Sequence, residues 1–574
     1  MNKPVILFHQ YSFKYHSQAE PSLIDINLTI NEGEKVLILG PSGSGKSTLA
    51  HCINGLIPFS YEGDSSGQLL INDKPVNELD IFTLSQMVGT VLQDTDGQFV
   101  GLSVGEDIAF SLENECVSQA AMKKIVQQTA QIVEVEEHID YSIHALSGGL
   151  KQRVSLGGVM VDEEVGILLF DEPLASLDPA TGQYTMDLID RIQKDQNKTV
   201  IMIEHRLEDA LQLSFDRIIV MDQGRIFSDT TPSQLLVSQT LDQVHIREPL
   251  YIKALKYSGA VLQNDQRLEQ INNLQLSEEN KKQLIHWIQN YKKDNHNQVE
   301  SSLLQVNQLS FAYLTSTTLK RISFSIKKGE MISLVGKNGA GKSTLAKVIS
   351  GFEKQDQGEI LLNNEPIHKQ TIFERANRIG FVMQNPNHMI SKHLIFDEVA
   401  LGLRLRHVPE DEVKHRVEET LKICGLYALR NWPIDALSFG QKKRVTIAAI
   451  LVLNPEILIL DEPTAGQDLR HFTEIMDFLN QLNKQGMTIL LVTHDMHVML
   501  EYTTRALVMV DGQVVADQPP VDVLTDRALI EKAHLKRTSL FDLALKAGIG
   551  DYKKFIEHFI SQDRKARKTW QQIF

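Results

Sequence analysis

The chain has 574 residues, 42% of them apolar, a length and composition typical of two or three globular domains. Acidic residues outnumber basic ones by 73 to 58, and the net charge of −15 argues against broad electrostatic binding of nucleic acid or anionic lipid. The three cysteines, Cys52, Cys116 and Cys424, lack the paired spacing of a zinc site, an iron–sulfur site or a disulfide framework, which favours a reducing cytoplasm.

The sequence contains no segment that predicts membrane insertion. The N-terminal stretch MNKPVILFHQYSFKY has no apolar core of the length that a signal peptide needs. The most apolar stretch, TIAAILVLNPEILIL, is interrupted by Asn454, Pro455 and Glu456, far short of the ~20 residues that cross a bilayer. If the protein serves a membrane process, we expect the membrane-spanning parts to lie on other chains.

Both halves of the chain begin with the same order of predicted elements. Each opens on a strand-like alternation, VILFHQYSFKY or LLQVNQLSFAY, and continues into a buried strand, KVLILG or MISLVG, that leads into a Gly-rich turn at which a helix must start. Later apolar runs, VGILLF and TVIMI in one half and EILIL and TILLV in the other, read as buried parallel strands separated by helices. The predicted fold class is therefore α/β, with a mainly parallel sheet in each half.

A repeated set of motifs runs through the chain in one order. The first copy reads GPSGSGKST, LQDTDGQF, LSGGLKQR, ILLFDEP and IEHR; the second reads GKNGAGKST, VMQNPNHM, LSFGQKKR, ILILDEP and VTHD. Corresponding residues of four of these motifs lie 296, 291, 290 and 289 positions apart. Such a constant offset indicates a duplicated domain.

The motif spacing also predicts the domain boundaries. The Gly-rich lysine and the serine of the LS motif are 101 residues apart in the first copy and 96 in the second, which leaves room for a helical subdomain. A bridge over about 241–300 holds a predicted capped helix, SEENKKQLIHWIQNYKK, with Leu284, Ile288 and Tyr291 on one side. We expect domains at 4–240 and 303–530, a linker at 241–300 and a helical tail at 531–574, whose basic end DRKARKTWQQIF is more simply a solvated helix end than a binding patch.

The Gly-rich turns have the pattern GxxxxGK[ST], which surrounds a phosphate with backbone N–H groups at a helix N-terminus. Lys46 and Lys342 are predicted to reach the β- and γ-phosphates of a nucleotide, and Ser47 and Ser343 to bind Mg²⁺. The loop residues concerned are Gly40, Pro41, Ser42, Gly43, Ser44, Gly45 and Thr48 in the first copy, and Gly336, Lys337, Asn338, Gly339, Ala340, Gly341 and Thr344 in the second.

Polar residues at the ends of later strands complete a predicted hydrolytic site. Asp171 and Asp461 are placed to hold Mg²⁺, and the following Glu172 and Glu462 to orient or deprotonate the attacking water. His205 and His494 each follow a strand and are candidates to bond the γ-phosphate; a lone histidine there is usually structural, and it is the doubled setting that favours a role in the site.

Two further pairs are candidate ligands of the nucleotide and its metal. Gln93 and Gln384 are candidates to contact Mg²⁺ or water. Tyr15 and Tyr313 lie 25 and 23 residues before their Gly-rich turns and are candidates to stack on adenine, although core packing explains an aromatic residue at a strand end equally well.

LSGGLKQ and LSFGQKK add a second phosphate cradle to each half. With these motifs the sequence resembles the ATP-binding-cassette (ABC) ATPases over nearly all of both halves. In that family the signature of one domain closes on the ATP held by the other. The resemblance therefore implies two composite ATP sites, one joining the first Gly-rich loop to Ser438 and Gly440, the other joining the second loop to Ser147, Gly148 and Gly149.

The segments after the two glutamines sharpen the resemblance. QDTDGQFVGLSVGEDIAF and QNPNHMISKHLIFDEVALG are similar to the corresponding run in ATPase subunits of energy-coupling-factor (ECF) vitamin importers, in a form with the two ATPases fused. This resemblance implies a peripheral location on the cytoplasmic face of the cell membrane. It also implies a transmembrane coupling subunit and a substrate-capture membrane protein as partners, with the small-molecule substrate bound by the latter and not by this chain. Asp94 and Asp96 replace the Asn and Asp of the pattern, and Asn387 takes the Asp position in the second copy.

Three related classes fit the sequence less well. ABC translation factors resemble each other in a strongly basic arm between the cassettes, whereas residues 241–300 hold eight basic and eight acidic side chains, so no nucleic-acid partner is expected. Fused sugar-importer ATPases usually have a decayed second Gly-rich loop, and GKNGAGKST is intact. ABC exporters normally carry TEVGERG before the signature, which neither YSIHALSGG nor NWPIDALSFG matches.

Two sequence features predict how the two ATP sites differ and where a membrane partner binds. Phe439 stands where the first copy has Gly148, so the site that uses this signature, at the first Gly-rich loop, is expected to be the slower; the alternative is that Phe439 keeps its backbone N–H and points away. The carboxylates around the Gln loops are expected to bind arginines of a membrane partner: Asp94, Asp96, Glu106, Asp107, Asp397 and Glu398.

Overall fold

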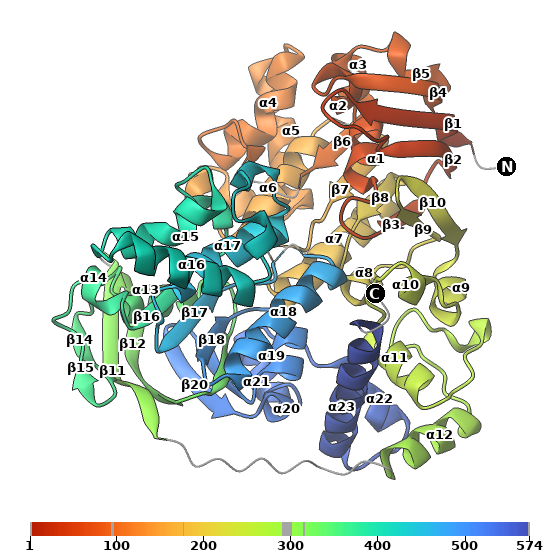
Figure 1. Cartoon of the computed structure of the whole chain (residues 1–574). Helices are drawn as coiled ribbons and strands as arrows, with labels where there is room; N and C mark the ends of the chain where they lie inside the picture. The colour runs from red at the N-terminus through yellow and green to blue at the C-terminus, as the bar shows by residue number, and fades with distance from the viewer. Residues whose placement is uncertain are drawn as a thin grey trace. The chain divides into compact units, whose positions relative to one another are not determined.

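The chain folds into two compact units. The computed structural model describes residues 3–92, 97–162, 164–175, 177–289, 301–313, 316–465 and 467–571. Unit 1 comprises Met1–Gln289 with Asp542–Gly550, and unit 2 comprises Asn290–Phe541 with Asp551–Phe574. Each unit holds one copy of the repeated motifs, and Figure 1 traces the elements of both along the colour bar.

A four-stranded antiparallel sheet opens each unit. In unit 1 its order is β2-β1-β4-β5, and in unit 2 it is β12-β11-β14-β15. Along β1 and β11 the apolar side chains that alternate in the sequence are buried, as the period-2 pattern predicts. The strands are β1 (Pro4–Tyr15), β2 (Leu23–Asn31), β4 (Gly63–Ile71) and β5 (Lys74–Pro75), with β11 (Ser302–Tyr313), β12 (Ser316–Lys327), β14 (Gln357–Leu362) and β15 (Glu365–Pro366).

A six-stranded sheet forms the centre of each unit. The orders are β10-β9-β3-β8-β7-β6 and β16-β17-β18-β13-β19-β20, and every pairing is parallel except that of the last hairpin. The predicted mainly parallel sheets are therefore confirmed. The strands are β3 (Lys35–Leu39), β6 (Val88–Val91), β7 (Ile167–Asp171), β8 (Thr199–Ile203), β9 (Arg217–Asp222) and β10 (Arg225–Thr230), with β13 (Met331–Val335), β16 (Ile379–Val382), β17 (Ile457–Asp461), β18 (Thr488–Val492), β19 (Arg505–Val510) and β20 (Gln513–Gln518).

The strand order fixes the position of the site. The central strands β3, β7 and β8 are almost wholly buried, and β3 pairs with β8, which pairs with β7. Because parallel strands end at one edge of the sheet, the Gly-rich loop after β3, the acidic pair at the end of β7 and the histidine after β8 come together there. The same holds for β13, β17 and β18 in unit 2.

Three helices in each unit form the predicted helical region between the Gly-rich lysine and the last strands (Figure 1). In unit 2 their apolar faces share one core with β17 and β18, centred on fully buried residues such as Val399, Val417 and Val445. The helices are α4 (Val104–Asn114), α5 (Gln119–Ile132) and α6 (Gly148–Met160), with α15 (Ile395–Arg404), α16 (Glu410–Ile423) and α17 (Phe439–Leu451).

The remaining helices follow the strands or form the linker and tail. α1 (Lys46–Ile53) and α13 (Lys342–Ser350) start at the Gly-rich loops, while α7 (Pro179–Gln196), α8 (Leu207–Ala210), α18 (Leu469–Lys484) and α19 (Met496–Tyr502) connect later strands. Shorter or peripheral helices are α2 (Leu56–Phe59), α3 (Ile81–Met87), α9 (Pro232–Val237), α10 (Thr240–Gln243), α14 (Ile372–Arg375), α20 (Pro520–Val523) and α21 (Arg527–Ala533).

The linker and the tail each contain helices in the described residues. α11 (Leu250–Tyr257) and α12 (Glu278–Gln289) lie in unit 1, and α12 buries Leu284 and Ile288 as its sequence predicts; Tyr291 lies outside the described residues. The tail contains α22 (Ser539–Lys546) and α23 (Tyr552–Gln571). Part of it, Asp542–Gly550, belongs to unit 1, where Lys546 Nζ donates to the carbonyl of Asn272 at 2.9 Å.

None of the described helices combines the length and apolar character that a membrane crossing requires.

Candidate nucleotide site

The two Gly-rich loops have the backbone conformation of a phosphate cradle. Gly45 and Gly341, the residues before the helices, have φ of 100° and 97°, a left-handed region that L side chains rarely adopt. A Cβ on Gly45 would also lie 2.7 Å from the carbonyl oxygen of Ser22. Both positions therefore require glycine, and the turn they make brings the first N–H groups of α1 and α13 to the mouth of the loop.

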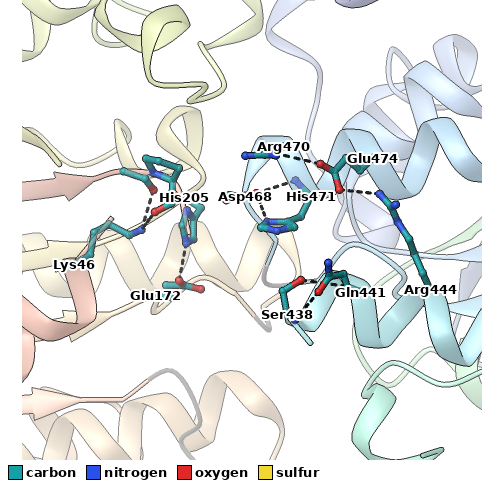
Figure 2. A network of polar contacts seen from close by, with 12 residues as sticks. Lys46, Glu172, His205, Ser438, Gln441, Arg444, Asp468, Arg470, His471 and Glu474 are labelled. Atoms are coloured by element: carbon teal, nitrogen blue, oxygen red, sulfur yellow. Dashed lines mark hydrogen bonds and ion pairs between the residues drawn. The ribbon is translucent and has the colours of Figure 1, made fainter. Parts of the chain in front are cut away.

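The lysines of the loops are folded back onto their own loops. Lys46 Nζ donates to the carbonyls of Gly40 and Pro41 at 2.8 and 2.9 Å, and Figure 2 shows this side chain reaching them. Lys342 Nζ donates to Gly336 and Lys337 at 2.7 and 3.0 Å. Each ammonium group is buried and bonded to carbonyl oxygens of its own loop. It therefore lies beside the N–H groups of that Gly-rich loop.

A carboxyl group lies beside each lysine, and in unit 2 the hydroxyl of Ser343 also bonds it. Burial raises the pKa of Asp171 to about 6, with Glu172 adding to the effect and Lys46 and His205 opposing it. Burial also raises the pKa of Asp461, against a hydrogen bond from Ser343 and the charge of Lys342. A divalent cation there would keep both carboxyls ionised, because its charge favours the carboxylate.

The donor set fits Mg²⁺ held together with phosphate. Among the described residues no group of three or more His, Cys, Asp or Glu side chains is placed to hold a metal ion. Mg²⁺ characteristically takes one or two protein oxygens and completes its shell with water and substrate phosphates, which a serine hydroxyl and one aspartate suit. Ser47 with Asp171, and Ser343 with Asp461, are the residues that would hold it.

Each glutamate that follows the metal-site aspartate is paired with a histidine. Glu172 Oε1 lies 2.9 Å from Nε2 of His205, and Glu462 Oε1 lies 2.8 Å from Nδ1 of His494. All four side chains are largely buried, which strengthens the interaction and keeps the carboxylates within reach of the sheet edge. The structure thus brings together, in each unit, the lysine, aspartate, glutamate and histidine that the sequence predicts.

The backbone at both glutamates is strained. Glu172 and Glu462 have φ of 49° and 46°, and their amides donate to Ile203 and Val492 of the neighbouring strand at 2.9 Å. A non-glycine residue in this region costs of order 1–3 kcal/mol and persists where surrounding structure enforces it. The pairing with the adjacent strand is what enforces it here, and it points the carboxylates off the end of the sheet.

The LS motifs cap long helices. Ser147 Oγ accepts the amide of Leu150 at the start of α6, and Ser438 forms a capping box with Gln441 at the start of α17, as Figure 2 shows. Gly149 and Gly440 each lie against the next helix: an added Cβ would meet Thr181 at 2.3 Å and His471 at 3.0 Å. Gly149 therefore allows the close approach of Thr181 within its unit, whereas a side chain at Gly440 would need His471 to shift slightly.

Phe439 fits its position without strain. Gly148, its counterpart, has no left-handed φ, and a Cβ added there would meet only Leu177, at 3.9 Å. Phe439 begins α17 and its ring is 44% exposed. The requirement for a left-handed glycine that would make this substitution disabling is thus not met, which favours the alternative in which Phe439 keeps its N–H and points away.

The two tyrosines differ in their surroundings. Tyr15 packs against the core of the small sheet and donates to Thr48 Oγ1 at 3.2 Å. Tyr313 is 39% exposed, contacts Phe311 edge to face at 4.7 Å and lies 3.3 Å from Glu353 through its hydroxyl. Tyr313 therefore has the more accessible ring and Tyr15 the larger packing role, while each contacts a threonine of its own Gly-rich helix, Thr344 or Thr48.

Of the two predicted glutamines, only Gln384 lies among the described residues. Gln93 lies outside the described residues, together with Asp94 and Asp96. Gln384 is exposed in the turn after β16, and Lys443 Nζ donates to its carbonyl at 2.5 Å. Gln384 is thus placed at the edge of the sheet where β17 and β18 also end.

Four of the carboxylates expected to bind a membrane partner are engaged within the chain. Asp107 accepts the amides of Val100 and Gly101, and Glu106 forms the capping box of α4 with Ser103. Similarly, Glu398 is buried and accepts the amides of Ser391 and Lys392, while Asp397 pairs with Arg404 at 2.9 Å. These groups stabilise their own loops, so the expectation of docking rests on Asp94 and Asp96.

Sequence reasoning missed a second acidic pair. Asp178 and Asp468 cap α7 and α18, accepting the amides of Thr181 and His471 at 3.0 and 2.9 Å. Asp468 also pairs with Nδ1 of His471 at 2.8 Å, which raises the pKa of that histidine (Figure 2). Their common offset of 290 residues, the same as that of the Asp-Glu motifs, is the signal that finds them.

The residues around the histidines also differ between the copies. Glu204, before His205, is buried and accepts the amides of Leu174, His205 and Arg206. Burial raises the pKa of Glu204, and the charge of Glu172 adds to the rise. The second copy has Thr493 there, whose hydroxyl contacts Glu462 at 3.4 Å. The first glutamate therefore has a buried carboxyl neighbour that the second lacks.

Comparisons with known proteins agree with this geometry. Residues 23–175 and 319–465 match the family described as ABC transporter, and residues 238–311 match one described as ATP-binding cassette cobalt transporter. Three proteins named as ABC transporter ATP-binding proteins are similar over almost their whole length. That of Clostridium perfringens is 56% identical over 98% of this chain and 99% of its own. That of Enterococcus faecalis is 56% identical over 99% and 100%. That of Photobacterium profundum is 53% identical over 98% and 99%.

Two solved structures are also similar. CbiO1 from Clostridium perfringens, described as part of the ABC transporter complex CbiONQ, is 38% identical, with 41% of this chain and 94% of that chain covered and a TM-score of 0.38. An ATP-binding cassette of an ABC transporter in its ADP conformation is 26% identical, with 40% and 98% covered and a TM-score of 0.38.

The repeated phosphate loops, the acidic strand ends and the relatives matched from end to end lead to one assignment. The chain belongs to the ATP-binding proteins of ABC transporters and is a tandem ATPase with two ATP-binding cassettes.

Proposed function

We propose that this protein is the energy-coupling ATPase of an ECF-type importer, which drives uptake of a small solute through separate transmembrane subunits. The observation that carries the proposal is the pair of complete hydrolytic sets, Lys46 to His205 and Lys342 to His494, on a chain whose described residues include no membrane-spanning helix. ATP hydrolysis by the two cassettes would then drive transport by partner chains that span the membrane.

The roles of the site residues follow from their chemistry. The Gly-rich loop residues and the ammonium groups of Lys46 and Lys342 would bind the ATP phosphates. Phosphate oxygens would then replace the loop carbonyls that the lysines contact in this structure. Tyr15 and Tyr313 would lie near the base, as the family resemblance implies. The signature residues Ser147, Gly148 and Gly149, with Ser438 and Gly440, would complete the sites across the two cassettes by the same resemblance.

The hydrolytic step depends on the glutamate–histidine pairs. Glu172 and Glu462 would take a hydrogen bond from the attacking water and receive its proton, and His205 and His494 hold each carboxylate in place until ATP enters. Bound Mg²⁺, held by Ser47 and Asp171 or by Ser343 and Asp461 with Gln93 or Gln384 nearby, would neutralise charge on the phosphates.

The partners are proposed from the sequence around the Gln loops, which is similar to that of ECF ATPases. These partners are a transmembrane coupling subunit and a substrate-capture membrane protein, at the cytoplasmic face of the cell membrane. The solute is then a vitamin or its precursor. A second candidate solute is the cobalt ion, because residues 238–311 match the family described as ATP-binding cassette cobalt transporter.

The test is purification of the protein from membranes with its partners retained, followed by reconstitution into vesicles. We expect polytopic proteins to co-purify and ATP outside the vesicles to drive inward movement of the co-purified small molecule. ATP-driven uptake of radiolabelled Co²⁺ into the same vesicles would identify the cobalt ion, and not a vitamin, as the solute. The Glu172→Gln/Glu462→Gln double variant, which binds ATP without turning it over, is the matched control. Outward transport, or hydrolysis with no membrane partner, would overturn the proposal.

A further inference from the structure

A buried lysine links two motifs of the second cassette. Lys443 lies in α17, the helix that Ser438 caps, and its side chain is 1% exposed, among the largest fully buried side chains of the described residues. Its Nζ donates to the carbonyls of Met383 and Gln384 at 3.0 and 2.5 Å. One side chain therefore joins the signature helix to the main chain of the Gln loop.

The charge of this lysine is balanced by the hydrolytic site. Asp461 and Glu462 are the acidic groups whose charges act on the buried ammonium, and its burial without them would be costly. A lysine whose donors are used by two backbone carbonyls holds their peptide groups in one orientation. The side chain of Gln384 starts from that fixed main chain.

The first cassette is built differently at this point. Gln152 stands where the second copy has Lys443, and its amide donates to the carbonyl of Pro173 and accepts from Thr185 Oγ1 at 3.4 Å. In the second copy the position of Thr185 is taken by Ile475, a buried apolar residue with no hydroxyl to offer. Gln152 thus joins the signature helix of the first cassette to the segment after Glu172, while residues 93–96 of its Gln loop lie outside the described residues.

We propose that Lys443 is a positioning residue of the second cassette, which holds the Met383–Gln384 turn on α17 so that the Gln loop and Ser438 move as one body. Among the described residues of the first cassette, Gln152 makes no such link. The inference rests on the proposed function in one respect: it takes the Gln loop as the place where Gln384 meets the metal or water. Its consequence is that movement at the Gln loop reaches the signature directly in the second cassette.

The loop itself provides a measurement that needs no nucleotide. Within the turn, the amides of His388 and Met389 donate to Asn385 and Pro386, so they exchange slowly with solvent while the turn is held. Hydrogen exchange with mass spectrometry, on the full-length protein without ATP, reports their protection. We expect Lys443→Gln and Lys443→Met to speed exchange in the peptide around residues 383–390 by about tenfold, since two charge-assisted hydrogen bonds are lost.

A neighbouring residue gives a matched control. Lys442 is the same residue type on the same helix, and none of its described contacts reaches residues 383–390, so Lys442→Met should leave that peptide unchanged. Lys443→Arg keeps the charge and the donors and should restore protection in part. A uniform increase in exchange rate across unit 2 would show general destabilisation. Unchanged exchange in residues 383–390 would show that Lys443 does not hold the turn. Either result overturns the proposal.

The functional arm uses a background in which the first glutamate is silenced. With Glu172→Gln present, we expect Lys443→Gln to lower kcat for ATP hydrolysis about tenfold and to leave the affinity for ATP within about twofold, because the lysine bonds the Gln loop and not the Gly-rich loop that binds phosphate. Normal kcat with a loosened turn would overturn the positioning role while leaving the ATPase assignment intact. Absence of hydrolysis in the unaltered protein would instead refute the proposed function.

Discussion

Oε1 of Glu172 and Nε2 of His205 lie 2.9 Å apart at the end of the central sheet, where the strand order brings polar groups together. The glutamate owes its orientation to a left-handed backbone, and the histidine to the strand β8 that precedes it. The second cassette repeats the pair with the other ring nitrogen, Nδ1 of His494. The two cassettes therefore share one glutamate–histidine arrangement and differ in the groups around it.

The first prediction concerns unequal turnover. The glutamate of the first cassette has buried Glu204 beside it, whereas that of the second has buried Lys443. Negative charge that develops on the phosphates during hydrolysis is favoured by a positive neighbour and opposed by a negative one. We expect Glu462→Gln to abolish most steady-state hydrolysis and Glu172→Gln to leave a substantial fraction.

Steady-state ATPase assays on the two single variants decide this point. The prediction does not depend on Phe439, since that position accepts a side chain without strain. Equal losses, or a greater loss from Glu172→Gln, would contradict the direction of the asymmetry. We expect Phe439→Gly to change turnover less than twofold. A larger change would attribute the asymmetry to Phe439 and not to the charges of Glu204 and Lys443.

A second prediction concerns ATP binding by the Gly-rich loops. Lys46 and Lys342 are held by loop carbonyls in the structure, and each would exchange them for phosphate oxygens. For ATP at 100 times its Kd, binding at one site stabilises the folded state by about 2.7 kcal/mol. In Lys46→Ala/Lys342→Ala we expect the rise in Tm caused by Mg-ATP to be lost, as scanning fluorimetry would measure, while exposed Lys194→Ala keeps it.

A third prediction concerns pH. The contact with Asp468 raises the pKa of His471, with Glu474 adding to the rise and burial and Arg470 opposing it. Because the folded pKa lies above the unfolded value of about 6.5, the stabilisation is complete below that pH and is lost as pH rises through the folded value. His471→Thr puts the residue of the first copy, Thr181, in its place and keeps a hydroxyl for Asp468.

Thermal unfolding at several pH values tests this directly. The Tm of the unaltered protein should exceed that of His471→Thr by the largest margin near pH 5.5 and by the smallest near pH 8.5. The effect is small, well below about 1 kcal/mol, because the ring is partly exposed. A margin that grows with pH would show that the histidine is not stabilised as a cation.

Much of this architecture is predictable from the sequence because the motifs are both periodic and local. Strands such as β7 and β17 are short runs of buried residues, and the Gly-rich loops impose their own backbone, so the sheet and the convergence at its edge follow. Tertiary contacts are harder to predict from the sequence. Nothing local in LSFGQKKR predicts that Lys443 is buried, since a lysine on a helix is usually solvated.

The same distinction explains the acidic residues near the Gln loops. Glu106 and Asp107 look like docking charges in the sequence, yet an acidic residue in the first turn of a helix is equally suited to capping, and the structure uses them so. Whether a carboxylate serves a partner or its own loop depends on where nearby amides point. That information enters only with the fold.

The last prediction concerns membrane docking. Of the carboxylates expected to meet a partner, Glu106, Asp107, Asp397 and Glu398 are bound within the chain, which leaves Asp94 and Asp96 beside Gln93. We expect Asp96→Arg to detach the ATPase from its membrane partners, because reversal of the charge opposes arginines on a coupling helix. Nucleotide affinity should stay unchanged, since the substitution leaves the Gly-rich loops intact.

Pull-down of the membrane subunits, with ATP affinity measured on the same preparation, tests the docking role. Asp107→Asn is the informative comparison, because it weakens the bonds to Val100 and Gly101 without reversing any charge. Loss of the partners from Asp96→Arg alone supports a charge contact at residue 96. If both variants lose their partners, the shape of the loop carries the interaction, and if neither does, the docking surface lies elsewhere on the cassette.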